Sequence, residues 1–111
     1  MSPLQITHDA ATTGPVLHVD GELDYEHSPA LRALVEHLGL GPGEELLLDL
    51  TGLQFCDSTG ISTLLAARQH AQAAGAEVVL TAVPPHTLRI LTLVGLDRVF
   101  TIRSADGSPG P

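Results

Sequence analysis

Apolar and polar residues alternate in two short stretches near the N-terminus, and this predicts two strands. Leu4, Ile6 and His8 share one side of the first strand, which we expect to have one buried face. Residues 15–20, with three apolar side chains, form the second strand. The Gly-Pro turn signal within residues 13–15 predicts that the two strands form a hairpin.

Residues 21–25 match no regular pattern, and a helix is predicted after them. Ser28 is a typical N-cap, and Pro29 suits the first helical position because its missing N–H would have no partner there. An apolar stripe at i, i+3, i+4 and i+7 follows, formed by Leu31, Leu34, Val35 and Leu38. Gly39 and the glycines after it end the helix.

From Glu45 onward, predicted strands and helices alternate. The leucine-rich run over 46–50 is typical of a central strand covered on both faces. A short loop leads to a second helix that begins at Asp57 and continues to about Ala74. The remaining elements are a strand over 77–83, a helix from Pro84-Pro85 with Leu88, Leu91 and Val94 as its buried candidates, and a last strand over 99–102.

The predicted order, β-β-α-β-α-β-α-β, indicates an α/β domain with a mixed β-sheet and helices packed on it. Alternating strands and helices imply parallel neighbours with right-handed crossovers, and the opening hairpin adds an antiparallel pair. The 111 residues suit one domain, which we expect to span residues 1–103. The tail over 104–111 is rich in Gly, Pro and Ser, and we expect it to be disordered.

Composition narrows the classes of protein that this chain can represent. Aromatic residues are only 3% and Trp is absent, so the core must be aliphatic. Thirteen acidic residues face five arginines and no lysine, which argues against binding to nucleic acid or to an anionic membrane. The lone Cys56 excludes an internal disulfide and favours a reducing compartment. No signal peptide and no apolar run of membrane-helix length is visible, so we expect a cytoplasmic protein.

The sequence offers no signature of a metal site, a cofactor site or an enzyme. The six histidines form no closely spaced pair, and Cys56 lies apart from them. Ser58 lacks the G-x-S-x-G pattern of a hydrolase nucleophile, and no Walker-type phosphate loop is present. We therefore expect a binding protein without metal or cofactor.

The sharpest local feature is a polar helix start, Asp57-Ser58-Thr59-Gly60, directly after the leucine-rich strand and its loop. The first N–H groups of a helix have no partner within the helix and carry partial positive charge, so they favour an anion such as a phosphoserine. Capping alone also explains Asp57 or Ser58 at this place. From the residues themselves both interpretations stay open.

Several segments of the chain, taken together, resemble a STAS domain of the bacterial anti-sigma-factor antagonist family. The resemblance covers roughly Leu4 to Arg103. It is carried by Gly21-Glu22-Leu23-Asp24, Leu48 to Leu53, Phe55-Cys56-Asp57-Ser58-Thr59-Gly60, Val94-Gly95-Leu96 and the strand at Val99 to Ile102. One departure is Thr59, which replaces the more usual second serine and adds a second hydroxyl.

The resemblance implies a partner switch. Its partner is an anti-sigma factor that is also a serine kinase, and the unphosphorylated antagonist binds that kinase and frees the sigma factor. The kinase uses ATP to phosphorylate the serine after the aspartate, here Ser58, and the antagonist dissociates until a metal-dependent serine/threonine phosphatase restores it. The implied partner-binding residues are Gly21, Glu22, Leu23 and Asp24, with Asp57, Ser58, Thr59, Gly60 and Ile61.

Two other functions remain open. Similar STAS domains serve as non-switching scaffold subunits of lipid-transport ATPases or stress-sensing assemblies, where Ser58 would be only a cap or a contact. A helix start can also hold the phosphate group of a small ligand, which would make the chain a sensor. Tyr25 and His27 follow the Asp24 loop and are candidate contact residues, but we favour the alternative that both are exposed residues without a role in binding.

Overall fold

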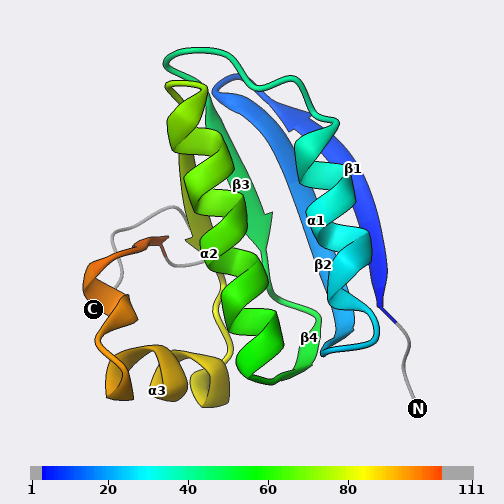
Figure 1. Ribbon diagram of the computed structural model, residues 1–111, viewed down its shortest axis with the longest axis vertical. Coiled ribbons are helices and arrows are strands. Elements are labelled where there is room, and N and C mark those ends of the chain that lie inside the picture. Colours follow the sequence, from blue (N-terminus) through cyan, green and yellow to red (C-terminus); the bar gives the residue numbers. More distant parts are fainter. Residues whose placement is uncertain (1–3, 104–111) are drawn as a thin grey trace.

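One mixed β-sheet and three α-helices are found in residues 4–103, which are the residues that the computed structural model describes (Figure 1). The strands are β1 (Gln5–Ala11), β2 (Gly14–Leu23), β3 (Glu45–Asp49), β4 (Leu53–Cys56), β5 (Glu77–Thr81) and β6 (Thr101–Arg103). The helices are α1 (Ser28–Glu36), α2 (Ser58–Ala73) and α3 (Pro85–Leu93), followed by the 3-10 turn η1 (Leu96–Arg98). The tail predicted to be disordered, 104–111, lies outside the described residues.

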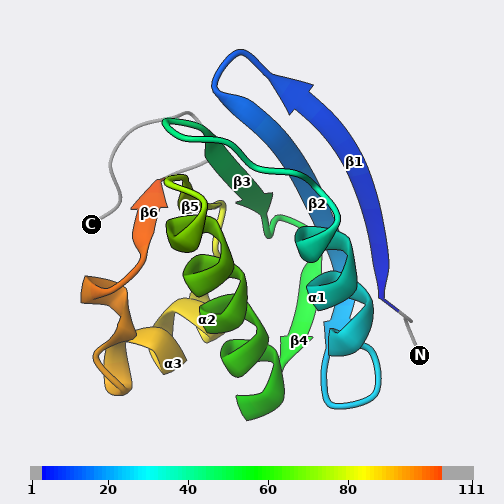
Figure 2. The ribbon, with the colours of Figure 1, turned by 45° about the horizontal axis from the view of Figure 1, so that its top comes forward.

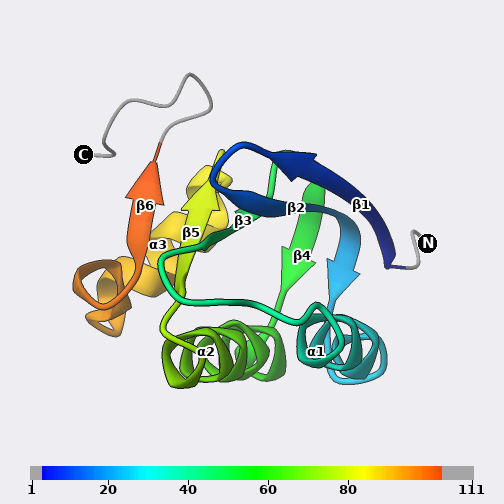
Figure 3. The ribbon, with the colours of Figure 1, turned by 90° about the horizontal axis from the view of Figure 1, so that it is seen from above.

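The sheet has the order β1-β2-β3-β5-β6, and β4 pairs with the far end of β2. β1 and β2 are antiparallel, and every other pairing is parallel. α1 and α2 lie side by side on one face of this sheet, whereas α3 lies apart from this pair and packs chiefly against η1 (Figures 2 and 3). The predicted mixed α/β architecture is therefore confirmed.

β4 and the last third of β2 were not predicted from the sequence. β2 continues through Leu23, and the residues expected to form a loop after β3 form β4 instead. The two segments pair with each other, and the register shifts between Gly21 and Glu22. Gly21 has a φ of 103°, which glycine adopts readily, and its N–H donates to the Gly52 carbonyl at 2.9 Å. A bulge of this kind bends the strand and increases its local twist.

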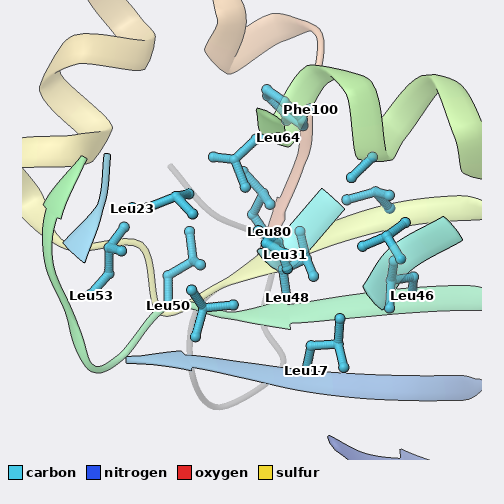
Figure 4. Packing of buried hydrophobic residues seen from close by; sticks show 14 of the residues in the cluster. Leu17, Leu23, Leu31, Leu46, Leu48, Leu50, Leu53, Leu64, Leu80 and Phe100 are labelled. Carbon is cyan, nitrogen blue, oxygen red and sulfur yellow. The ribbon is translucent and has the colours of Figure 1, made fainter. Parts of the chain in front are cut away.

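The core is aliphatic, as the composition predicts. Leucines from β2, β3, β5, α1 and α2 meet between the sheet and the two helices (Figure 4). Among the fully buried side chains are Leu17, Leu31, Leu48, Leu64 and Leu80. Burial of one such side chain contributes roughly 1.5–3 kcal/mol. Of the three aromatic residues, only Phe100 is buried.

One expectation about burial holds in part, and two are wrong. The expected face of β1 is only partly covered, because Leu4 and Ile6 are half-buried and pack against the core whereas His8 is exposed. β3 is not covered on both faces, since Leu47 is only half-buried; β5 is the strand with consecutive buried residues, Val78 to Leu80. Val94, a candidate for the buried side of α3, is 61% exposed.

The start of α1 also differs from the prediction. Ser28 is the first helical residue and not the cap, and its buried hydroxyl has no hydrogen-bond partner in the described part of the chain. Asp24 organises this turn instead. Its Oδ1 accepts hydrogen bonds from the His27 backbone N–H at 2.9 Å and from His27 Nδ1 at 2.8 Å, and its carbonyl accepts from the Ser28 N–H.

A histidine–carboxylate pair joins neighbouring strands on the sheet. His18 Nδ1 on β2 lies 2.7 Å from Asp49 Oδ2 on β3. The other ring nitrogen of His18, Nε2, lies 3.8 Å from Asp9 Oδ2 on β1. The hydrogen bond to Asp49 raises the pKa of His18. Burial alone would raise the pKa of Asp49, but hydrogen bonds from Thr51 and His18 outweigh it and lower that pKa.

This pair should make the stability depend on pH. A raised pKa means that the His18 contribution is full below the ordinary pKa of 6.5 and declines as the pH rises through the folded-state value. The Asp49 contribution is present above about pH 4 and declines on acidification. We expect wild type to exceed His18→Gln in unfolding free energy by about 0.2–1 kcal/mol near pH 5.5. Urea titrations near pH 5.5 and pH 9 would measure it. A difference that is larger at the alkaline pH would contradict this account.

Candidate functional site

Two segments that are far apart in the sequence meet at one end of the molecule. The loop between β2 and α1 lies beside the junction of β4 and α2, so both helices begin at this end (Figure 1). The Tyr25 N–H donates to Asp57 Oδ2 at 3.3 Å, and the Asp57 N–H donates to the Leu23 carbonyl at 3.4 Å. The predicted Gly21–Asp24 and Asp57–Ile61 segments therefore lie next to each other and together make up one candidate site.

Asp57 holds this site together. Its backbone is extended, it occupies the N-cap of α2, and its Oδ1 accepts a hydrogen bond from the Gly60 N–H at 2.9 Å. Its other carboxylate oxygen accepts from Tyr25. One side chain thus caps the helix and fastens the neighbouring loop to it. The capping interpretation of Asp57 is confirmed.

Replacement of Asp57 tests how much its two hydrogen bonds stabilise the protein. Asp57→Ala removes both hydrogen-bond acceptors, and we expect it to lower the unfolding free energy by about 0.5–2 kcal/mol. Asp57→Asn retains a capping oxygen and should lose much less. Thermal unfolding of the three proteins would measure the effect. Equal stability of the alanine variant and wild type would contradict the capping role.

Ser58 is exposed at the first position of α2, and Thr59 beside it is half-buried. The backbone N–H groups of Ser58 and Thr59 precede the first intrahelical hydrogen bond, while that of Gly60 is occupied by Asp57. An anionic group on the Ser58 hydroxyl would therefore lie near the positive end of the helix dipole. Of the two adjacent hydroxyls, that of Ser58 belongs to the more exposed residue.

Gly60 permits a close approach of α2 to β2. A Cβ atom at this position would lie 2.2 Å from the Leu23 carbonyl oxygen and 2.7 Å from Cys56 Sγ. Leu23 is fully buried, and Ile61 is 8% exposed. These residues, with buried Gly21, shape the site from beneath. Of the predicted residues, those whose side chains can contact a partner directly are Glu22, Asp24, Asp57, Ser58 and Thr59.

An aromatic residue and a groove complete the candidate site. The sequence offered Tyr25 as a contact candidate but favoured the alternative without a role, and it gave no sign of the groove. Tyr25 is 80% exposed, as predicted, and it lines a groove of about 550 Å³ between the starts of α1 and α2. His27, which was also expected to be exposed, is half-buried and bonded to Asp24. The groove is lined by Tyr25, Glu26, Ser28, Pro29, Arg32, Thr59 and Thr63. The only signal in the sequence is an aromatic residue within a polar loop, and exposed aromatic side chains are enriched among binding hot spots.

The surface around Ser58 is acidic. Hydrogen bonds from the His27 backbone and then its imidazole lower the pKa of Asp24, so this carboxyl is ionised at neutral pH. Potential ligand atoms of Glu22, Asp24 and His27 lie within 4.8 Å of one another. A cation there would compete with the hydrogen bond that joins Asp24 to His27 Nδ1.

The one cysteine is not a reactive group of this site. Cys56 is 4% exposed, and burial together with the charge of Asp57 raises the pKa of its thiol to about 12. It is therefore a protonated, packed side chain at neutral pH. Within residues 4–103, no helix has both the length and the apolar character to cross a membrane.

Comparisons with known proteins match nearly the whole chain. The family model described as "Mlab, STAS domain" matches residues 6–103. A Mycobacterium tuberculosis protein named as a candidate anti-anti-sigma factor is 31% identical over 104 residues, which cover 91% of this chain and 70% of that protein. The anti-sigma-B factor antagonist of Listeria monocytogenes is 26% identical over 91 residues, covering 82% of this chain and 80% of the Listeria protein.

The fold is also shared with a solved structure. The anti-sigma factor antagonist SpoIIAA of Bacillus, in its unphosphorylated form, superposes with a TM-score of 0.74 at 19% identity over 92% of this chain and 90% of that one. Its phosphorylated form gives a TM-score of 0.67 at 19% identity over 92% and 94%. At this identity the likeness shows the fold alone.

Proposed function

Because this chain belongs to the STAS domain family, we propose that it is an anti-sigma-factor antagonist controlled by phosphorylation of Ser58. The unphosphorylated chain binds an anti-sigma factor that has serine kinase activity, and the sigma factor is released. The kinase transfers the γ-phosphoryl group of ATP to the Ser58 hydroxyl, and the antagonist dissociates. A serine/threonine phosphatase returns it to the binding form. Its role is binding and not catalysis.

The names of the relatives support the antagonist function. Anti-sigma factor antagonists from Listeria and Paenibacillus match about four-fifths of this chain. SpoIIAA, which shares the fold, exists in an unphosphorylated and a phosphorylated form. The observation that carries the proposal in this chain is the exposed Ser58 at the N-terminus of α2, with an acidic and aromatic surface around it.

The position of Ser58 suits a modification that acts on the partner and not on the fold. A phosphate at the first position of α2 would find backbone N–H groups and the positive end of the dipole, so the helix tolerates it. The modification adds about −1.5 to −2 charge at pH 7. That negative charge would add to the charges of the Asp57 and Asp24 carboxylates at the same surface. A partner surface shaped for a neutral hydroxyl would then meet extra charge and bulk.

An in vitro phosphorylation experiment tests the proposal. Purified chain would be incubated with ATP, magnesium and the candidate anti-sigma kinases of the same cell, and the product mapped by mass spectrometry. We expect one phosphate on Ser58, absent from Ser58→Ala and retained in Thr59→Ala. Phosphate on Thr59 would contradict the assignment of the acceptor. A kinase that binds the chain without modifying it would favour a non-switching scaffold.

A further inference from the structure

The segment that forms α3 and η1 lies apart from α1 and α2 (Figure 3), and it carries a second group of exposed apolar side chains. Leu93 is 79% and Val94 61% exposed, and Ile90 and Val99 are each exposed by more than a third. Four of the six exposed large apolar side chains in the described part of the chain lie on this short segment. The α3 face is defined here as Arg89, Ile90, Leu93, Val94, Arg98 and Val99.

The exposed residues of α3 form a stripe and are not scattered. Ile90, Leu93 and Val94 recur at i, i+3 and i+4, so they share one side of the helix. Leu91, on a different side, is fully buried against the core. α3 therefore carries a second apolar side with nothing in the described residues covering it. Contiguous apolar surface of this kind marks an interaction site.

The α3 face is basic in an acidic chain. Residues 84–103 hold three of the five arginines and only Asp97 of the thirteen acidic residues. Arg103 forms a two-bond ion pair with Glu45, at 3.0 and 2.8 Å. Arg89 in α3 and Arg98 in η1 are both exposed, so this segment carries two positive charges together with its apolar stripe. Binding to an anionic membrane typically needs a cluster of about four to eight basic residues. Two arginines on a chain of net charge −8 are too few for that.

The complementary surface is present on the same chain. The Tyr25 corner, defined as Glu22, Asp24, Tyr25 and Glu26, presents Tyr25, which is 80% exposed, next to exposed Glu26 and half-buried Glu22 and Asp24. The α3 face presents apolar side chains together with two arginines. We propose that the α3 face of one copy of this chain docks on the Tyr25 corner of a second copy. Two different surfaces meet in such a contact, so it continues head to tail from copy to copy.

Self-association of this kind does not depend on the phosphorylation switch. It would, however, cover the end of the molecule that carries Ser58. A copy docked there and an anti-sigma factor would then compete for the same surface. The attraction rests partly on exposed charges, so salt should weaken it.

Sedimentation equilibrium of the full chain tests the proposal. We expect the weight-average mass to rise with concentration above the monomer mass of 11.6 kDa, to pass twice that value without a plateau, and to fall with added salt. Arg89→Glu/Arg98→Glu should lower the association constant at least about tenfold, because like charges then face each other. Glu26→Arg should have a similar effect from the other surface.

Two controls make the test specific. Glu36→Arg changes the net charge as much as Glu26→Arg but lies at the other end of α1, so we expect wild-type association. A mixture of Arg89→Glu/Arg98→Glu with Glu22→Arg/Glu26→Arg should associate more than either variant alone, because opposite charges face each other again. Circular dichroism would establish that each variant is folded.

Three results would overturn the proposal. The first is a chain that stays monomeric at every concentration and salt. The second is a mass that levels off at twice the monomer mass, which indicates a two-fold dimer through one shared surface. The third is equal loss of association in Glu36→Arg and Glu26→Arg, which indicates a net-charge effect.

Discussion

Ser58→Glu is expected to weaken binding of the anti-sigma factor by about two to three orders of magnitude, equivalent to roughly 3–4 kcal/mol. Glutamate places a permanent charge at an exposed position beside Asp57, where the proposed interface accepts a neutral hydroxyl. The helix itself should tolerate the change, since a carboxylate near a helix N-terminus is favourable. Titration calorimetry with the purified anti-sigma factor would measure the loss.

A matched control lies one turn along the same helix. Ser62 is exposed, and its hydroxyl donates to the Ser58 carbonyl at 3.0 Å. Ser62→Glu adds the same charge to α2 away from its first residue, and we expect a much smaller loss of affinity. Ser58→Ala should bind as wild type does. If Ser58→Glu bound as tightly as wild type, charge at this position would not control the partner.

Gly60→Ala should destabilise the protein by about 1–3 kcal/mol, although alanine is a better helix former by about 1 kcal/mol. The added Cβ would lie 2.2 Å from the Leu23 carbonyl oxygen, so α2 or β2 has to move. The same carbonyl accepts the hydrogen bond from Asp57, so the move would disturb the site as well. Urea unfolding would measure the change.

Gly41→Ala is the control for this substitution. A Cβ at Gly41 would meet only Glu44 Oε1, at an ordinary contact distance of 3.5 Å. We expect the stability of this variant to stay within about 0.5 kcal/mol of wild type. Equal stability of Gly60→Ala and Gly41→Ala would show that α2 can move from β2 without penalty.

Local sequence signals were sufficient to predict the helix that carries Ser58. Asp57 is a strong capping residue, and Gly75 ends the helix with a φ of 78°. Both signals act within a few residues of the helix end, so they can be read without knowledge of the fold. Only the family resemblance grouped Asp24 and this helix start as partner-binding residues, and the hydrogen bond between Tyr25 and Asp57 shows that the two segments are neighbours.

β4 could not be predicted in the same way. It has four residues, and its partners in β2 lie about thirty positions earlier. No periodicity can develop over four residues, and the pairing is decided by the bulge at Gly21. The unexpected length of β2 has the same cause, because the last three residues of β2 pair with no strand other than β4.

Apolar periodicity was ambiguous where both sides of an element are apolar. In α3, Leu91 faces the core, while Leu93 and Val94 face outward. A period of 3.6 residues fits either set, so the sequence could not tell which side the fold would cover. In β1, an apolar residue such as Ile6 indicates a buried face, but an edge strand has fewer neighbours to bury it.

The shielded thiol of Cys56 makes the base of the Ser58 helix observable without any added label. It is the only cysteine of the chain, it is 4% exposed, and it directly precedes the residue that caps α2. A thiol reagent can reach it only in molecules in which α2 has transiently separated from β2. The rate of labelling therefore reports the free energy of the opening that exposes this thiol, and a value below the free energy of global unfolding identifies a local opening of α2. A partner that clamps the helix start would slow the labelling, and a partner that pulls it open would accelerate it.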